Sequence, residues 1–459
     1  RTLKLAPEQP YATKMLAVLR GEAVEIDTRI KLIEVMLQER LHGPALSECL
    51  KLLNDKALSE LQRPKVMTLQ AESLVRMHKG PDARNVLHEL IALYPQQADP
   101  VKTTLLLGEA KLQGDERSIA EALVVLKKLV ADHPQTPAAV RAQYDIITHD
   151  PVLVAGVGRA EAMAKWLAAN SEHEFANSGR HILLDAYLNI TGQGTKPGPE
   201  SDLSPTDVKA LALAAEIYRR ELSAKKADEL TKRLLSHIRS RYYGNKAYTA
   251  AVKAAETLLA APLPRSSRLS VLKALGSSKY LVAGEWLDEM ARAGQLPVGV
   301  RRGQLPEKLA DVLATFKMIR TEYPAVPFWT DQANLAKRVR ASASRVLPQA
   351  EFKGLNGPDA WALDIAMPVI KANADASAVK SAVQTVQVII DERAKVQKPG
   401  SRKLAVDLGL ELLEAISPSH QSWSGAMVSY YNVAGNYAHY VFQENIKAGR
   451  AEKNAKLSE

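Results

Sequence analysis

The apolar residues of this chain recur at helical spacing, in stretches that end at a proline. Residues 119–130 contain four apolar residues separated by four, three and four positions: Ile119, Leu123, Leu126 and Val130. That spacing places them on one face of an α-helix. Pro134 follows, and proline ends a helix because it lacks the backbone N–H. No stretch alternates apolar and polar residues long enough to predict a β-sheet. The pattern therefore predicts an all-α chain.

The helical unit occurs more than once. Residues 86–97 (VLHELIALYPQQ) and 125–136 (VLKKLVADHPQT) are similar in sequence and lie 39 positions apart. Looser copies end in a proline within 314–324 and 408–418. A second helix is expected after each of these prolines, within 99–112, 137–147, 328–339 and 422–441. Because one hairpin cannot cover its own apolar faces, several consecutive hairpins must stack to complete a core.

Two of these hairpins resemble the tetratricopeptide (TPR) repeat. On that family's frame of about 34 residues, residues 64–97 fill the two small, the large apolar and the final proline positions with Ala71, Ala83, Leu87 and Pro95. The next hairpin supplies the Leu107–Gly108 pair, Ala122, Leu126 and Pro134, with a longer turn between its helices. Neither has the family's first-helix tryptophan. The resemblance implies an α-solenoid of antiparallel helical hairpins.

Glycine- and proline-rich breaks divide the chain. They lie at 191–205, 293–306, 353–359 and 397–400. We expect a TPR-like array over 1–190, a linker at 191–205 and a middle helical block over 206–292. A second linker at 293–306 and a C-terminal block of degenerate repeats over 307–459 follow. Ser204 is the predicted N-cap of the helix after the first linker, with Pro205 in its first turn and Asp207 at its positive end.

Candidate chemical motifs are incomplete. Gly156 and Gly158 follow an apolar run, as in a dinucleotide-binding loop, but Glu161 stands where the third glycine is needed. The histidines are scattered, and His173 has no second histidine four residues later. Cys49 is the only cysteine, which excludes an intrachain disulfide, and it lies on an apolar helical stripe that predicts packing. The sequence therefore predicts no catalytic residue, no cofactor site and no metal site.

Positive charge is concentrated in one segment. The net charge is +10, and residues 231–253 contain six Lys or Arg and no acid. Apolar residues recur there every four positions and are expected in the core: Leu230, Leu234, Ile238 and Tyr242. The candidate partner-binding residues are those off this stripe, with the neighbouring tyrosines: Arg239, Arg241, Tyr243, Lys246 and Tyr248. The same segment also fits a solvated helix face or a surface for nucleic-acid phosphates.

The function predicted from these features is a non-enzymatic scaffold or adaptor. It would bind a protein partner, through an acidic surface or a peptide, along a helical-repeat surface within a larger assembly. Two alternatives stay open: a nucleic-acid-binding helical array, and the helical support region of a cell-envelope enzyme. No apolar stretch reaches the roughly 20 residues of a membrane span, which leaves peripheral membrane association open.

The location rests on a resemblance. The cadence of helix, Tyr-Pro, helix at 93–95 and 322–324 is similar to that of repeat arrays in bacterial envelope-accessory proteins. This resemblance implies a periplasmic or envelope-associated subunit of a complex, with the cytoplasm as the alternative. The chain opens with Arg1 rather than Met, which is expected of a processed or truncated product.

Overall fold

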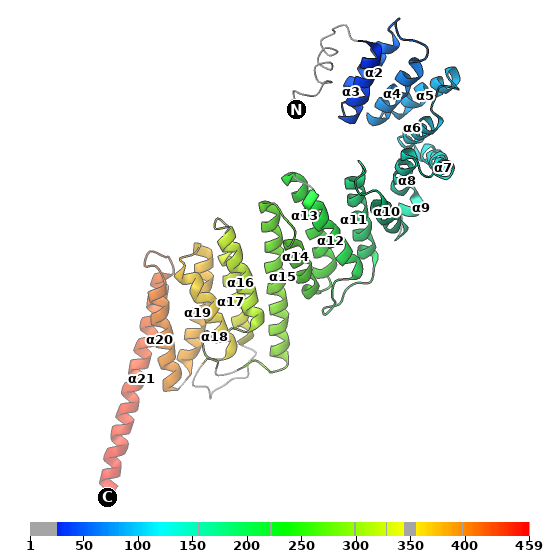
Figure 1. The fold of residues 1–459 in the computed structure, drawn as a ribbon. Helices are drawn as coiled ribbons and strands as arrows, with labels where there is room; N and C mark the ends of the chain where they lie inside the picture. Colours follow the sequence, from blue (N-terminus) through cyan, green and yellow to red (C-terminus); the bar gives the residue numbers. More distant parts are fainter. Residues whose placement is uncertain are drawn as a thin grey trace. The chain divides into compact units, whose positions relative to one another are not determined.

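The regular structure of the described residues is helical throughout. The computed structural model in Figure 1 describes residues 25–154, 157–220, 223–297, 300–326, 328–343, 355–396 and 398–458. Across these ranges every secondary-structure element is a helix, so the all-α prediction is confirmed. The chain divides into two compact units, residues 1–190 and 191–459. Gly156 and parts of three predicted breaks (298–299, 353–354 and 397) lie outside the described residues.

The first unit is a succession of helical hairpins. Its helices are α2 (Ile26–Gln38), α3 (His42–Leu53), α4 (Arg63–Arg76), α5 (Gly80–Leu93), α6 (Pro100–Leu112), α7 (Glu116–Asp132), α8 (Pro137–His149), α9 (Pro151–Val154), α10 (Val157–Ala169) and α11 (Ala176–Gln193), the last of which continues into the second unit. From α2 to α8 each helix packs on the next (Figure 1), and the alternate helices α2, α4, α6 and α8 also pack on one another. These four helices form one wall, which we call the inner wall.

The repeated apolar positions form the contacts between hairpins. Leu87, Leu90 and Leu126 are fully buried, and Leu129 is 3% exposed. As expected, α5 ends at Leu93 and α7 at Asp132, shortly before the prolines of the repeated text. The predicted role of these positions is therefore confirmed.

Small residues allow the helices to approach closely. Ala71 and Ala83 have no exposed surface. At Gly108 of α6, a Cβ atom would lie 2.5 Å from Leu126 Cδ2 and 2.8 Å from Leu126 Cγ on α7. Carbon atoms do not approach this closely, so the pairing of α6 with α7 requires glycine at position 108.

The second unit continues the side-by-side packing of helices. It contains α12 (Pro205–Arg220), α13 (Ala224–Ile238), the π-helical turn η1 (Arg239–Tyr243), α14 (Tyr248–Leu259), α15 (Arg265–Arg292), α16 (Glu307–Glu322), α17 (Trp329–Ala343), α18 (Gly357–Lys371), α19 (Ala376–Lys395), α20 (Pro399–Ala415) and α21 (Trp423–Ser458). Helices α14 to α21 each pack on a neighbour along the chain (Figure 1). One contiguous apolar core extends from Leu272 of α15 to Val433 of α21.

Several local predictions from the sequence are confirmed. Ser204 caps α12, because its Oγ accepts a hydrogen bond from the Asp207 backbone N–H at 3.1 Å, and Pro205 is the first residue of that helix. Cys49 is fully buried, and burial raises the pKa of its thiol to about 12. Its thiol is therefore protonated and unreactive at neutral pH. Residues 151–154 are helical, where a dinucleotide loop would need a strand.

The close contact at Gly108 gives a testable prediction. The substitution Gly108→Ala places a methyl group inside Leu126, and overpacking of this kind costs about 1–3 kcal/mol. Because alanine also gains roughly 1 kcal/mol in a helix, we expect a net decrease of up to about 2 kcal/mol in the free energy of unfolding of the first unit. The change is measured by urea unfolding, with amide hydrogen exchange in α6 and α7 as the signal. The matched control is Gly43→Ala, where no atom lies within 4 Å. Equal stability of the two variants would contradict the packing account.

Candidate functional site

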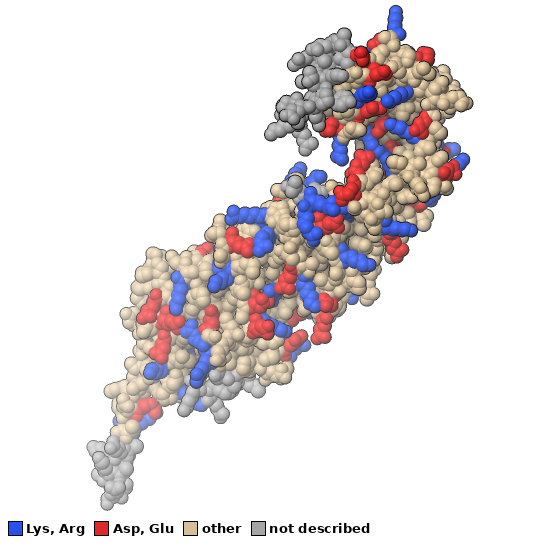
Figure 2. All heavy atoms as spheres, viewed as in Figure 1, with Lys and Arg blue, Asp and Glu red and all other residues tan. Residues whose placement is uncertain are grey.

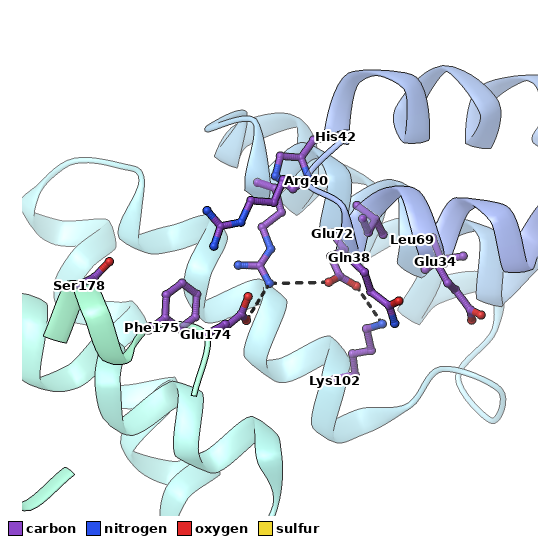
Figure 3. Close-up of a pocket in the computed structure, with 12 residues that line it drawn as sticks. Glu34, Gln38, Arg40, His42, Leu69, Glu72, Lys102, Glu174, Phe175 and Ser178 are labelled. Carbon is purple, nitrogen blue, oxygen red and sulfur yellow. Dashed lines mark ion pairs between the residues drawn. The ribbon is translucent and has the colours of Figure 1, made fainter. Parts of the chain in front are cut away.

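The inner wall of the first unit is hollowed into a groove. A first hollow of about 730 Å³ lies over α2, α4 and residues 174–178 (Figure 3). A second hollow of about 550 Å³ lies over α4, α6 and α8. Arg76 and Phe175 line both hollows, which therefore adjoin. We call the two together the inner groove.

Paired charges line the first hollow. Lys102 Nζ of α6 lies 2.9 Å from Glu72 Oε2 of α4, and Figure 3 shows both side chains pointing into the hollow. Arg76 Nη2 lies 3.6 Å from Glu174 Oε1 and 3.9 Å from Glu72 Oε1. Lysine, glutamate and arginine side chains from distant parts of the sequence thus form a continuous row of ion pairs with alternating charge. Such a surface offers donors and acceptors to a ligand without strong attraction for either sign of charge.

An aromatic ring is held where the two hollows meet. The Phe175 ring stacks on Tyr144 with centroids 5.0 Å apart and an interplanar angle of 14°. The guanidinium carbons of Arg141 and Arg76 lie 4.9 Å and 5.8 Å from its centroid. Trp166 supports Tyr144 from behind at 5.2 Å. The half-buried Phe175 is therefore a fixed apolar surface, against which an aliphatic or proline side chain of a ligand can pack.

A buried and a half-buried carboxyl group lie in the second hollow. Glu109 of α6 is 5% exposed, and its Oε1 forms an ion pair with Arg141 Nε of α8. Burial raises the pKa of Glu109, against the opposing charge of Arg141, and the charge of Asp145 raises it further. Burial likewise raises the pKa of Asp145, although Arg141 and Arg76 oppose it. The pair therefore holds a proton at higher pH than ordinary carboxyl groups do.

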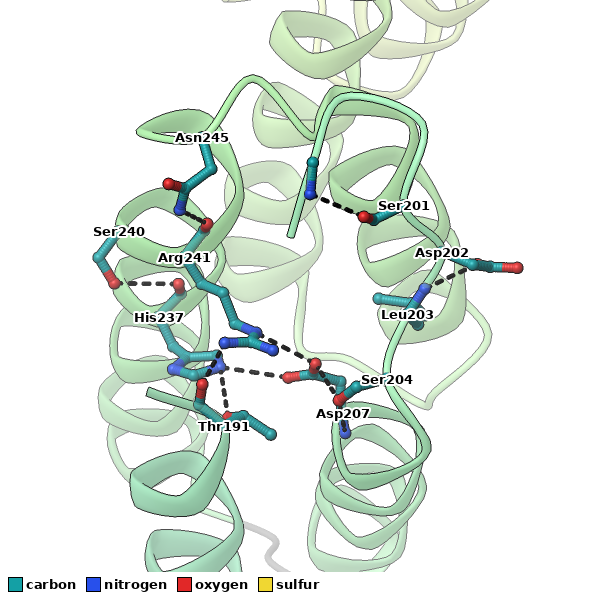
Figure 4. Close-up of polar contacts among 11 residues, drawn as sticks. Thr191, Ser201, Asp202, Leu203, Ser204, Asp207, His237, Ser240, Arg241 and Asn245 are labelled. Atoms are coloured by element: carbon teal, nitrogen blue, oxygen red, sulfur yellow. Dashed lines mark hydrogen bonds and ion pairs between the residues drawn. The ribbon is translucent and has the colours of Figure 1, made fainter. Parts of the chain in front are cut away.

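The predicted partner-binding residues lie elsewhere, in the second unit. Arg241 Nε lies 3.2 Å from Asp207 Oδ2, and the Arg241 side chain is only 10% exposed (Figure 4). Tyr243 Oη lies 2.8 Å from Ser278 Oγ, and its ring lies edge-on against Tyr248. Arg239 and Lys246 are exposed. Internal contacts thus occupy Arg241 and Tyr243, and binding of a partner by this surface stays a prediction.

The apolar stripe predicted for the same segment is confirmed. All four of its residues are at most 5% exposed: Leu230, Leu234, Ile238 and Tyr242. On the face of the molecule that Figure 2 shows, Lys and Arg are intermingled with Asp and Glu.

A polar cluster ties the start of the second unit together. Asp207 of α12 is 3% exposed and accepts hydrogen bonds from Ser204 Oγ at 2.5 Å and Arg241 Nε at 3.2 Å (Figure 4). His237 Nε2 lies 3.4 Å from Asp207 Oδ1 and 3.1 Å from Thr191 Oγ1. Burial alone raises the pKa of Asp207, but contacts with His237, Ser204 and Arg241 outweigh it and hold the pKa well below its usual range. Asp207 is therefore ionised and neutralises a buried arginine.

Sequence reasoning missed the inner groove, although one signal was available. Glu72 and Glu109 each follow directly after the small residue of a first helix, Ala71 and Gly108. The next residue of a helix lies about 100° further round, turned away from the second helix of its hairpin. An acid at this position in two successive hairpins therefore marks the inner wall.

Metal sites and membrane-spanning helices are both absent from the described residues. Within the described ranges, no three His, Cys, Asp or Glu side chains are grouped so that they could hold a metal ion. In those ranges, too, no helix combines the length and the apolar character that crossing a membrane requires.

The Asp207 cluster gives a second prediction. Asp207→Asn leaves the Arg241 charge buried without a counter-ion, and we expect the second unit to lose about 3 kcal/mol of unfolding free energy. Folding lowers the pKa of Asp207, so its ionised form stabilises the folded state. The difference in unfolding free energy between wild type and Asp207→Asn should therefore have its full size above pH 5 and decrease below about pH 4, where unfolded Asp is protonated. Urea unfolding followed by tryptophan fluorescence measures it, since four of the five tryptophans lie in this unit.

The control for this prediction is Asp202→Asn. Asp202 is paired with Lys253 at 2.7 Å, but its side chain is 66% exposed, so the substitution should leave stability unchanged. Equal changes in unfolding free energy for the two substitutions would show that the buried cluster does not stabilise the second unit.

Known proteins are only distantly similar to this chain. No protein-family model matches the sequence, and no curated protein matches it. Among solved structures, a chain of Naa15/Naa10 bound to HypK-THB has 14% identity and a TM-score of 0.28, covering 91% of this chain and 57% of its own. Human IFIT1 with m7Gppp-AAAA has 12% identity and a TM-score of 0.26, with 92% and 93% covered. The P58(IPK) TPR domain has 13% identity and a TM-score of 0.22, with 91% and 99% covered. The present chain thus spans a little over half of the first of these, and its all-α assignment rests on its own helices.

Proposed function

We propose that this protein is a non-enzymatic scaffold whose first unit binds an extended segment of a partner protein in the inner groove. The observation that carries the proposal is the composition of the groove. Four equivalent helices of consecutive hairpins contribute side chains to the two adjoining hollows: α2 to the first, α8 to the second, and α4 and α6 to both. Binding along stacked repeats uses such a surface, because each hairpin adds one more set of contacts.

The dimensions of the groove fit a short polypeptide. Packed helices lie about 8–10 Å apart, so four helices in a row span roughly 25–30 Å. An extended chain advances about 3.3 Å per residue, and the groove therefore accommodates about eight residues. Phe175, where the hollows meet, would contact an apolar side chain near the middle of the segment.

The charges of the groove favour a protein segment over nucleic acid. Lys102, Arg76 and Arg141 each lie within 3.6 Å of a carboxylate of Glu72 or Glu174. A phosphate backbone would have to compete with these carboxylates and would be repelled by them. Polypeptide backbone and side chains of both signs match the alternating donors and acceptors. The periplasmic or envelope location stays a prediction from the sequence, as does peripheral contact with a membrane.

The test uses peptides directly. A phage-displayed library of random 12-residue peptides is selected on the full chain, and the affinity of selected peptides is measured by fluorescence anisotropy. Phe175→Ala removes the central apolar contact, and we expect at least a tenfold loss of affinity. The control is Val124→Ala on α7, a residue 70% exposed and outside the groove lining, which should leave affinity unchanged.

Two results would contradict the proposal. One is a failure to select any binding peptide. The other is selection of peptides whose affinity is the same for the Phe175→Ala and Val124→Ala variants. Random-sequence RNA is measured alongside at several salt concentrations. Salt-sensitive RNA binding that is tighter than peptide binding and is lost in Phe175→Ala would replace the proposal with the nucleic-acid alternative.

A further inference from the structure

The second hollow of the inner groove contains acceptor atoms that the chain itself does not satisfy. Glu109, Asp145 and Gln113 line this hollow, and their atoms Oε2, Oδ2 and Oε1 are buried without a donor from the rest of the chain. The Glu109 and Asp145 carboxyl groups lie close enough to share a hydrogen bond when one of them holds a proton. A buried acceptor left without a donor costs about 1–3 kcal/mol, and more when it carries charge. The residues that carry these three atoms line one cavity, so a ligand side chain that enters it can bring a donor to them.

The charges around these atoms define what that donor is. Glu109 interacts with Asp145 and with the guanidinium groups of Arg141 and Arg76. Glu174 pairs with the same two arginines, at 3.4 Å and 3.6 Å. Three carboxyl groups thus share two guanidinium groups. With all three ionised, the cluster has one uncompensated negative charge, which either a proton or a ligand cation can neutralise. Glu109 is its buried member, whereas the Glu174 side chain is 50% exposed.

We propose that the second hollow binds one Lys or Arg side chain of the segment held in the inner groove, and that this cation displaces a proton shared by Glu109 and Asp145. The inference rests on the proposed function and adds a sequence requirement to it. An ammonium or guanidinium group supplies both the positive charge and several N–H donors. A carboxylate or an apolar side chain would leave the acceptors unsatisfied.

The proposal implies that binding strengthens as pH rises. Because the pKa values of Glu109 and Asp145 are raised, the pair holds a proton under mildly acidic conditions and must release it to accept a cation. Affinity should therefore increase by up to about tenfold per pH unit across the range in which the pair titrates, and level off above it.

Other ionisable groups face the same hollow. Arg76 and His78 come from the α4 end, and Arg141 and His149 come from α8. Glu174, which lines the first hollow, lies 3.4 Å from Arg141. His149 Nδ1 lies 2.9 Å from the Asp145 carbonyl oxygen and so is held beside the pair. The released proton is therefore assigned to Glu109 by substitution.

The experiment starts from the groove-binding peptides selected above at pH 8. Each Lys or Arg of a peptide is replaced in turn by norleucine, which keeps the aliphatic stem and removes the charge. Isothermal titration calorimetry with the full chain at pH 6.5, in two buffers of different ionisation enthalpy, gives the affinity and the number of protons released. Glu109→Gln is compared with Glu89→Gln, an exposed glutamate on the second helix α5.

We expect one Lys or Arg of the peptide whose replacement weakens binding by about 10- to 100-fold, as for loss of a charge-assisted hydrogen-bonded pair. Wild type and Glu89→Gln should release up to one proton on binding, and Glu109→Gln should release fewer and lose most of the dependence on the cation. The norleucine comparison leaves the protein unaltered, so it does not depend on how well Glu109→Gln folds.

The inference fails separately from the proposed function. It is overturned if peptides bind in the groove, as shown by sensitivity to Phe175→Ala, yet contain no Lys or Arg or tolerate norleucine at every one. It is also overturned if Glu109→Gln releases as many protons as Glu89→Gln. If no peptide binds at all, the proposed function falls and the inference falls with it.

Discussion

The close approach of helices in successive hairpins is the contact on which the first unit depends. At Gly108 the backbone of α6 lies so near Leu126 that a single methyl group would not fit, and Ala71 and Ala83 are buried without exposed surface. Each hairpin thereby covers an apolar face of the next, and the apolar clusters of this unit each join neighbouring helices. Because the contacts are local and repeated, α2, α4, α6 and α8 line up as one wall.

That wall explains why polar chemistry gathers where it does. A first helix packs with its partner and its neighbours and keeps one face free, and the groove lies on this face. Most charged groups there are paired across helices, but Glu109 is 5% exposed with one oxygen unsatisfied. Folding gains nothing from burying such an oxygen. Under the proposed function, a ligand bound in the cavity would offset this cost.

The sequence was informative where structure is set by neighbours along the chain. Periodic leucines, prolines after helices and the cap formed by Ser204 involve residues within a few positions of one another. It was uninformative where contacts join distant positions. Arg241 meets Asp207 across 34 positions, and Arg141 meets Glu109 across 32. Periodicity placed Arg241 off the apolar stripe, but it carries no information on what packs against that side, so it could not predict the ion pair of Arg241 with Asp207.

The central claim is that the inner wall is the binding surface of this protein. The most direct measurement is hydrogen–deuterium exchange of the full chain with and without a selected peptide. The account predicts slower exchange in α4, α6, α8 and residues 173–178, and unchanged exchange in the second helices α5 and α7. Protection confined to α5 and α7, or to the π-helical turn and α14 in the second unit, would contradict it.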